Sequence, residues 1–382
     1  MSLLHAAKHN NICSIRWDDA IERYGDDTIA LSVADMDFQA PQAIIDAVTK
    51  RAAAGNFCYT YLDNDYYQAV TNWLSQRHNW RVSSEEIVPV GRMVESLPAI
   101  LREVVGEQSK VAVPFPAYSP TISAIHAANC KVSPWPLLFV DGHYEYDFAT
   151  LETLLSNADA LVITSPHNPT GRVWDTEELH LIADIARKTH TLVISDEFHM
   201  DFLRPGHTFT PYLTCTHEGD QAISFTSPGK TFNIAGLETA NIIVPDGQLR
   251  EKVRKAIDDA GCHNPRFFAQ AATIGGYVHS ADWLDELLDL INEHALLIHQ
   301  TLSGIPDVSS VPTEGTYLAW LDMRATGLTD EELEQRLTQH GLALTPGTEF
   351  GIGGEGFMRL NMAVPTPLLK QALERLQHAF AE

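Results

Sequence analysis

The chain of 382 residues is 45% hydrophobic and 20% charged, a composition typical of a folded protein with a large core and unlike a disordered chain. Fifty acidic against 26 basic residues give a formal net charge of −24, which repels polyphosphate backbones and argues against nucleic-acid binding as the main activity. Five scattered cysteines without a CxxC pair, and no stretch resembling a signal peptide or a membrane span, predict a cytoplasmic protein with reduced thiols, no metal site and no membrane association.

Short β-branched runs alternate with helical patterns between about residues 85 and 245. This alternation predicts a mostly parallel sheet with helices on both faces. One helix is expected to begin after Asp175, because Glu178 follows at capping-box spacing and apolar residues then recur at helical intervals. The runs lie at residues 87–90, 110–114, 160–164, 191–195, 222–226 and 241–245.

A second mixed α/β segment follows a long helical region. It is expected to contain a strand at 316–322, a capped helix within 329–341 and another strand at 357–363. We find no internal repeat, low-complexity tract or like-charge block. The sequence therefore predicts a smaller C-terminal lobe beside the larger sheet.

Polar and aromatic residues follow several of the predicted strands. In open parallel sheets, ligands bind beyond the carboxyl ends of the strands, so these residues are candidates for one shared site. Taken singly, each has an ordinary explanation, such as a turn for the asparagine, a solvated strand end for the aspartate or a surface charge for the lysine. In chain order, the residues are Gly91, Arg92, Met93, Tyr118, Asn168, Asp196, His199, Ser227 and Lys230.

Taken together, these residue types suit a pyridine aldehyde. A lysine must be neutral to form a Schiff base, and burial lowers its pKa toward that state, which is a role for Lys230. A protonated pyridine nitrogen is a suitable partner for the Asp196 carboxylate at a buried strand end. Asn168 and His199 could donate hydrogen bonds to a ring oxygen, and Tyr118 could stack on the ring.

A phosphate group on the same ligand has candidate donors too. The backbone amides at a helix start bind anions, and Gly91 to Met93 precede a helical stretch. The hydroxyl of Ser227 is a further candidate. The combined pattern predicts pyridoxal 5'-phosphate as the cofactor.

Motifs spread over almost the whole chain strengthen this interpretation. The chain resembles the fold-type I pyridoxal-phosphate enzymes of the aminotransferase class I/II superfamily, and within them the cystathionine β-lyase-like C-S lyases of the MalY/PatB group. The matching segments are SVADMDF (32–38), CYTY (58–61), SPHNPTGRVW (165–174), SDEFH (195–199), KTFNIAGL (230–237), EGTYLAWLD (314–322) and EGFMRLNMA (355–363).

The resemblance implies an α/β fold with two domains. A large cofactor-binding domain at 46–280 would contain a mostly parallel seven-stranded sheet sandwiched by helices. A smaller α/β domain would be formed by 281–382 together with the N-terminal segment 1–45.

The resemblance also implies roles for individual residues. Lys230 would bind the cofactor aldehyde, Asp196 would face the pyridine nitrogen, Asn168 would donate to the ring oxygen and Tyr118 would stack on the ring. Tyr118 and Asn168 would also border the substrate.

Further implied roles fall on residues outside the strand ends of the large sheet. Tyr59 would reach the cofactor phosphate of the neighbouring subunit, which implies a homodimer with shared active sites. Arg359 would bind the substrate carboxylate, for which its planar guanidinium is suited, although a strand-edge charge is the alternative. Ala34 and Asp35 would line the substrate entrance.

The chain departs from the family pattern at the phosphate site. Arg92 and Met93 stand where small or aliphatic residues are usual, and we hypothesise that Arg92 adds a contact to the phosphate or the substrate rim. Gly229 replaces a common serine before the lysine, which leaves Ser227 as the phosphate hydroxyl. Glu238 occupies the position, eight residues after the lysine, where many aminotransferases have a phosphate-binding arginine.

The resemblance therefore favours a C-S β-lyase. Such an enzyme would cleave cystathionine or a related cysteine S-conjugate by α,β-elimination into a thiol such as homocysteine, pyruvate and ammonia. An aminotransferase is the alternative, since both reactions begin with removal of the Cα proton. A further alternative is a regulatory protein-binding role that retains the fold. The preferred sulfur amino acid and any regulatory partner stay open.

Overall fold

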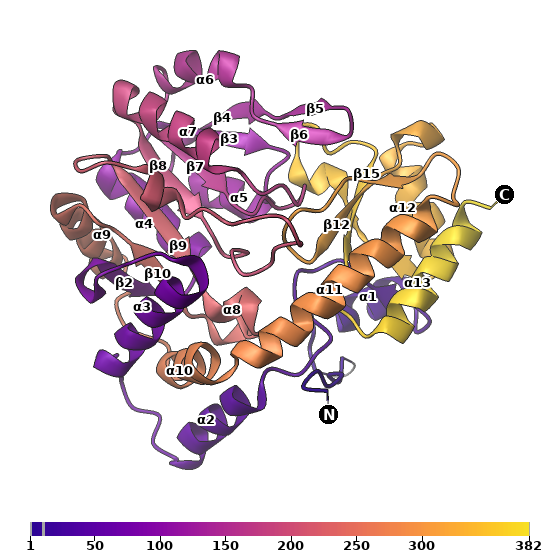
Figure 1. Cartoon of the computed structure of the whole chain (residues 1–382), viewed down its shortest axis with the longest axis horizontal. Coiled ribbons are helices and arrows are strands. Elements are labelled where there is room, and N and C mark those ends of the chain that lie inside the picture. Colours follow the sequence, from indigo (N-terminus) through magenta and orange to yellow (C-terminus); the bar gives the residue numbers. More distant parts are fainter. Residues whose placement is uncertain (1, 10–11, 382) are drawn as a thin grey trace.

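The computed structural model describes residues 2–9 and 12–381. A seven-stranded sheet forms the centre of its larger lobe (Figure 1). Strand β10 runs antiparallel to both its neighbours, and the other adjacent strands are parallel. The mostly parallel seven-stranded sheet is thus confirmed. In spatial order the strands are β2 (Ile87–Val90), β10 (Ala240–Ile243), β9 (Ala222–Thr226), β8 (Leu192–Asp196), β7 (Ala160–Thr164), β3 (Lys110–Phe115) and β4 (Lys131–Pro136).

Alternate residues of the central strands point to opposite faces of this sheet, and each face has its own apolar core. In β7, Leu161 and Ile163 join one core, whereas Val162 joins the other. The helices on the first face include α6 (Phe148–Leu155) and α7 (Thr176–Thr189), and those on the second are α4 (Met93–Val104), α5 (Ser119–Ala127) and α9 (Gly247–Asp259).

The predicted start of α7 is confirmed. The Asp175 side chain accepts from the Glu178 backbone N–H at 2.8 Å, and the Asp175 backbone N–H donates to the Glu178 carboxylate at 2.8 Å. This reciprocal pair satisfies two amide groups that a helix start otherwise leaves without partners.

A smaller antiparallel sheet forms the second lobe, which Figure 1 shows in orange and yellow. Its strand order is β11 (Ser309–Ser310), β12 (Leu318–Asp322), β15 (Phe357–Asn361) and β14 (Thr345–Pro346). Both predicted C-terminal strands, and the capped helix that begins after Thr329, are therefore present. The helices of this lobe are α11 (Ala281–Leu302), α12 (Asp330–Gln339) and α13 (Thr366–Ala379).

The N-terminal segment pairs with the C-terminal part of the chain. Strand β1 (Ile29–Ala30), which follows α1 (Trp17–Tyr24), lies parallel to β13 (Leu342–Ala343). Helix α11 runs from the side of the large sheet to the small lobe (Figure 1). The division of the chain at residues 45 and 280 stays a prediction.

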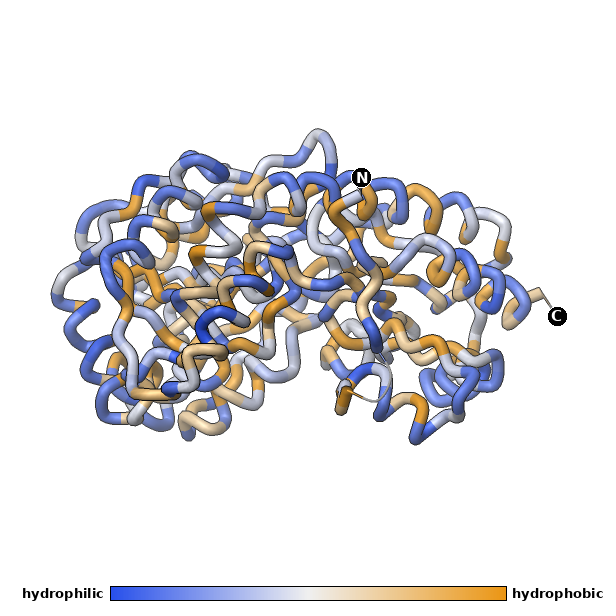
Figure 2. The backbone as a smooth tube through the Cα atoms, turned by 90° about the horizontal axis from the view of Figure 1, so that it is seen from below, coloured by the Kyte–Doolittle hydropathy of each residue, from blue (hydrophilic) through white to orange (hydrophobic). Residues whose placement is uncertain are grey.

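Remaining elements complete the large lobe. They are α2 (Gln42–Ala53), α3 (Asn64–His78), the hairpin of β5 (Leu138–Val140) and β6 (His143–Glu145), α8 (Pro228–Thr231) and α10 (Ala269–His279). In Figure 2 the outer helices and loops are mostly hydrophilic, while hydrophobic segments are frequent in the interior. In the described residues, no helix is both long and apolar enough to cross a membrane.

Candidate active site

Lys230 lies on the short helix α8, directly after β9. Ser227 caps this helix: its hydroxyl accepts from the Gly229 N–H at 2.9 Å and donates to the Thr239 carbonyl at 2.7 Å. A Cβ at Gly229 would lie 2.9 Å from that hydroxyl, so the present position of the Ser227 side chain depends on the glycine. The turn fixes Lys230 beside the end of β8.

The Lys230 amine lies in a largely desolvated position. Its Nζ donates to the Ala34 carbonyl at 2.6 Å. Burial lowers the pKa of Lys230 from 10.5 to about 8, with Asp35 opposing and Arg359 reinforcing the shift. About one tenth of the amine is therefore neutral at pH 7, compared with less than one thousandth at the ordinary pKa, and a nucleophilic lysine reacts in its neutral form.

Asp196 is the last residue of β8 and its side chain is buried. Its Oδ1 accepts from the Phe198 N–H at 3.2 Å. Burial raises the pKa of Asp196 to about 6, although this backbone hydrogen bond and the charge of Lys230 act in the opposite direction. A buried carboxylate that is ionised at neutral pH needs a cationic partner, and a protonated ring nitrogen would provide one.

Arg359 lies in β15 and is buried, so it is not a solvated strand-edge charge. Its guanidinium donates to Asn168 Oδ1 at 3.0 Å, to the Ser32 carbonyl at 2.9 Å and to Thr345 Oγ1 at 3.3 Å. Its Nε has no hydrogen-bond partner, and no ion pair to it is formed within the described residues. Burial lowers the pKa of Arg359 to about 10. Such an unneutralised guanidinium is suited to binding a carboxylate.

The charges of the site also act on Tyr118 and His199. Burial raises the pKa of the Tyr118 hydroxyl, and the charge of Asp196 adds to this effect, while Arg359 opposes it. His199 is buried, and its Nδ1 has no partner in the described part of the chain. Burial, with the charges of Lys230 and Arg359, holds the pKa of His199 well below 6.5. The imidazole is therefore neutral and offers a free ring nitrogen.

The predicted phosphate-binding residues Gly91 to Met93 lie at the start of α4. Arg92 is the N-cap residue and Met93 the first helical residue, so the first amide groups of α4 have no intrahelical acceptor. A Cβ at Gly91 would lie 2.9 Å from the Glu95 carboxylate and 3.1 Å from the Arg266 guanidinium, the ends of two flexible side chains. The amides remain available to an anion, as predicted for a helix start.

Arg92 and Ser227 already have partners within the chain. The Arg92 side chain is 53% exposed and pairs with Glu238 at 3.3 Å, and Glu238 also pairs with Arg266 at 3.0 Å. Glu238 thus bridges two arginines. The Ser227 hydroxyl donates its one O–H hydrogen bond to the Thr239 carbonyl. For both residues, a contact to phosphate stays a prediction.

Tyr59 is 93% exposed, and its neighbours Phe57 and Tyr61 are also exposed. In a single chain these rings lie on the surface. The predicted contact of Tyr59 with the cofactor of a second subunit therefore stays a prediction.

Sequence reasoning missed three residues that hold the segment 32–38 over the site. Asn361 donates to the Val33 carbonyl at 2.7 Å, and the Tyr317 hydroxyl donates to the Ala34 carbonyl at 2.9 Å. Both belong to motifs quoted above, so the motifs themselves were a signal. Arg16 contacts Asp35 and Asp37, and nothing in its local sequence indicates this.

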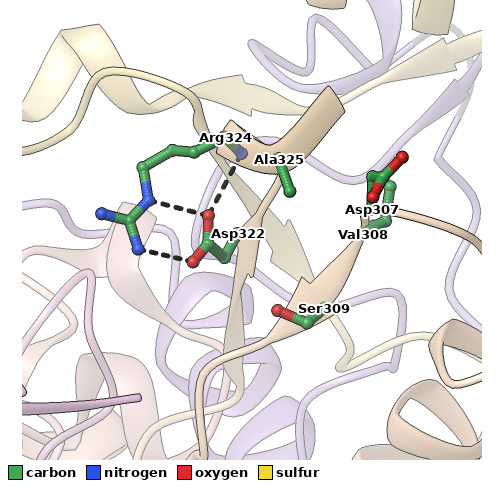
Figure 3. Close-up of a pocket in the computed structure, with 6 residues that line it drawn as sticks. All are labelled: Asp307, Val308, Ser309, Asp322, Arg324 and Ala325. Atoms are coloured by element: carbon green, nitrogen blue, oxygen red, sulfur yellow. Dashed lines mark hydrogen bonds and ion pairs between the residues drawn. The ribbon is translucent and has the colours of Figure 1, made fainter. Parts of the chain in front are cut away.

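A hollow of about 410 Å³ lies elsewhere, on β11, β12 and the turn that follows β12 (Figure 3). The Arg324 guanidinium donates to both oxygens of Asp322, at 2.9 and 2.7 Å. Its charge is therefore already neutralised, and the hollow contains none of the predicted site residues. We do not assign the chemistry to it.

The whole chain is similar to proteins of known family and structure. Residues 26–376 match the family described as aminotransferase class I and II. The chain is 36% identical to cystathionine β-lyase PatB of Bacillus subtilis strain 168, over 96% of this chain and 97% of that protein. It is also similar to the crystal structure of cystalysin from Treponema denticola, which contains pyridoxal 5'-phosphate. The TM-score is 0.94 and the identity 31%, over 100% of this chain and 98% of that chain. The crystal structure of a PLP-bound C-S lyase from Staphylococcus hominis matches with a TM-score of 0.91 and 26% identity, over 99% of this chain and 97% of that chain.

Proposed function

Because the chain belongs to the aminotransferase class I and II family, we propose that it is a pyridoxal-phosphate-dependent carbon–sulfur β-lyase. It would cleave cystathionine or a related cysteine S-conjugate into a thiol, pyruvate and ammonia. The observation that carries this proposal is similarity, over nearly the whole chain, to a cystathionine β-lyase, to cystalysin and to a C-S lyase. Glu238 agrees with it, since an acidic residue paired to two arginines stands where many aminotransferases have a phosphate-binding arginine.

The cofactor is pyridoxal 5'-phosphate, and the groups at the site fit it. Lys230 supplies an amine for the aldehyde, Asp196 a buried carboxylate for the ring nitrogen, and His199 a buried Nδ1 without a partner. The start of α4 offers amides for the phosphate. When bound, the cofactor withdraws electrons from the substrate Cα, which makes the Cα proton acidic and allows the Cβ–S bond to break.

The chain's own residues would then perform three tasks. Arg359 binds the substrate carboxylate and so orients the Cα–H bond. The Lys230 Nζ accepts the Cα proton, for which its lowered pKa is suited. Asp196, as a carboxylate, keeps the ring nitrogen protonated and the electron withdrawal strong.

We further propose that the protein is a cytoplasmic homodimer with shared active sites. The exposed aromatic rings of Phe57, Tyr59 and Tyr61 support this assembly, because a cluster of exposed aromatics is typical of an interface. In such a dimer, Tyr59 would contact the cofactor phosphate bound by the other subunit. The scattered cysteines agree with a reducing compartment.

A side-by-side assay tests the function. The purified protein, loaded with pyridoxal phosphate, is incubated with cystathionine alone and, separately, with an amino acid plus 2-oxoglutarate. We expect equal amounts of thiol and pyruvate from cystathionine and little glutamate from the second mixture, and Lys230→Ala should abolish the first reaction. Glutamate formation without thiol release would instead identify an aminotransferase, and inactivity in both assays would favour a binding role.

A further inference from the structure

The backbone of residues 32–36 is held by two side chains with proposed roles in the reaction, Lys230 and Arg359, and by Asn361. Lys230, Arg359 and Asn361 each donate to a carbonyl of this segment. This one segment therefore links the three side chains. A charged residue in the segment also lies close to them. The accepting carbonyls are those of Ser32, Val33, Ala34 and Asp35.

An ion pair holds the carboxylate of this segment. Arg16 is 1% exposed, and its Nε lies 3.1 Å from Asp35 Oδ1, while its Nη1 donates to the Asp35 carbonyl at 3.0 Å. Arg16 also pairs with the buried Asp37, which accepts a further hydrogen bond from Trp17 Nε1 at 2.9 Å. One guanidinium thus contacts two carboxylates.

The backbone of this segment contacts the Lys230 amine directly. Lys230 donates to the carbonyl of Ala34, the residue that precedes Asp35. Of the charges that act on the pKa of Lys230, the effect of Asp35, which raises it, is larger than those of Arg359, which lowers it, and Asp196, which raises it.

The other groups that face the amine are uncharged at neutral pH. His199 is neutral because burial holds its pKa well below 6.5. The Tyr317 hydroxyl donates to the Ala34 carbonyl, and burial raises its pKa strongly. Burial also raises the pKa of Tyr118. The Asp35 carboxylate, one residue after the carbonyl that accepts from Lys230, is therefore the group outside the predicted cofactor contacts that favours the protonated amine.

We propose that Asp35 is a positioning residue that holds the Lys230 ammonium against the Ala34 carbonyl, and that Arg16 limits this effect by pairing with the same carboxylate. The proposal rests on the proposed role of Lys230 as the reactive amine. It assigns to residues 32–36 a second task besides the predicted lining of the substrate entrance. The ion pair would thereby set how readily the Lys230 Nζ holds or gives up a proton.

The test is Asp35→Asn, with labelling of Lys230 as the readout. Arg16 keeps Asp37 as a partner in this variant, so no buried charge is left unpaired and the protein should fold. Competitive acetylation of the cofactor-free protein at a series of pH values, followed by peptide mass spectrometry, gives the pH midpoint for Lys230. We expect the midpoint to fall by about 0.5 to 1 pH unit, at the low end for a nearby charge because Asp35 is partly exposed and already paired.

The direction of the shift distinguishes charge from structure. If Asp35 only braced the segment, its loss would admit water to Lys230 and the midpoint would rise. An unchanged or raised midpoint in Asp35→Asn would therefore overturn the proposal. Asp35→Glu keeps the charge and should return the midpoint to within about 0.3 units of the parent, since only the geometry of the pair changes.

A second variant tests Arg16. Arg16→Gln alone would leave Asp37 buried without its cation, so the change is made together with Asp37→Asn, and Asp37→Asn alone is the matched control. The double variant should raise the midpoint above that of the control, opposite to Asp35→Asn, and a lowered midpoint would contradict the assigned role of Arg16. The labelling uses the cofactor-free chain, so it tests the role of Asp35 independently of the role of Lys230 in binding the cofactor. The second role is tested separately by the visible absorbance of the cofactor, which Lys230→Ala should lose.

Discussion

Replacing Lys230 with methionine should stabilise the cofactor-free protein at neutral pH. Methionine has a similar length and no charge, whereas the lysine ammonium must be desolvated on folding. The pKa of Lys230 falls from 10.5 in the unfolded chain to about 8 in the folded one. At about 1.4 kcal/mol for each pKa unit, the protonated lysine destabilises the folded state by roughly 3 kcal/mol at pH 7.

This gain must depend on pH in one direction. Between pH 8 and pH 10.5 the unfolded chain binds a proton that the folded chain has lost, so the stability of the parent rises with pH across this window. The advantage of Lys230→Met should therefore shrink from roughly 3 kcal/mol at pH 7 to about 2 at pH 9 and below about 1 at pH 10.

Urea unfolding of both cofactor-free proteins at these pH values measures the difference. One fixed protein concentration is used throughout, because subunit association would otherwise shift the transition. A methionine variant that is less stable than the parent at pH 7, or an advantage that stays constant up to pH 10, would refute the view that Lys230 is a desolvated amine.

Three further predictions follow from the packing and charges. Arg359→Lys should lower kcat/KM about 100-fold with an unchanged cofactor spectrum, because lysine cannot form a bidentate pair with the substrate carboxylate; steady-state kinetics check this, and a loss below about threefold would contradict it. Burial raises the pKa of Glu197 from 4.5 to about 8. Between these pH values the folded parent binds a proton that the unfolded chain has lost, so this group makes the parent less stable as the pH rises. The urea midpoint of Glu197→Gln, relative to the parent, should therefore be higher at pH 8 than at pH 5. A Cβ at Gly276 would lie 2.6 Å from the Phe232 ring, whereas one at Gly236 would meet no described atom within 4 Å; Gly276→Ala should cost about 1–3 kcal/mol and Gly236→Ala less than about 0.5 in urea unfolding, and equal effects would show that this contact is not tight.

The strands of the large sheet could be predicted because they are buried on both faces and therefore read as apolar runs. Predicted and observed bounds of β2, β7 and β9 coincide. The pattern does not contain strand direction, so the antiparallel β10 could not be foreseen. The edge strand β4 was missed because its sequence, KVSPWP, contains two prolines and its exposed positions interrupt the apolar run.

The site could be predicted as far as it follows strand ends. Asp196 and Lys230 stand at the ends of neighbouring parallel strands, which brings their side chains to one edge of the sheet. Arg359 needed the motif, because it lies within a strand of the other lobe. Arg16 was out of reach of sequence reasoning, since its contact with Asp35 depends on how two separate segments pack together.

Trapping the lysine–cofactor bond tests the central assignment most directly. The cofactor-loaded protein is reduced with borohydride, digested, and analysed by peptide mass spectrometry. We predict one pyridoxyl-phosphate group for each chain, located on Lys230. A stable adduct on a different lysine, with Lys230 unmodified, would contradict the account.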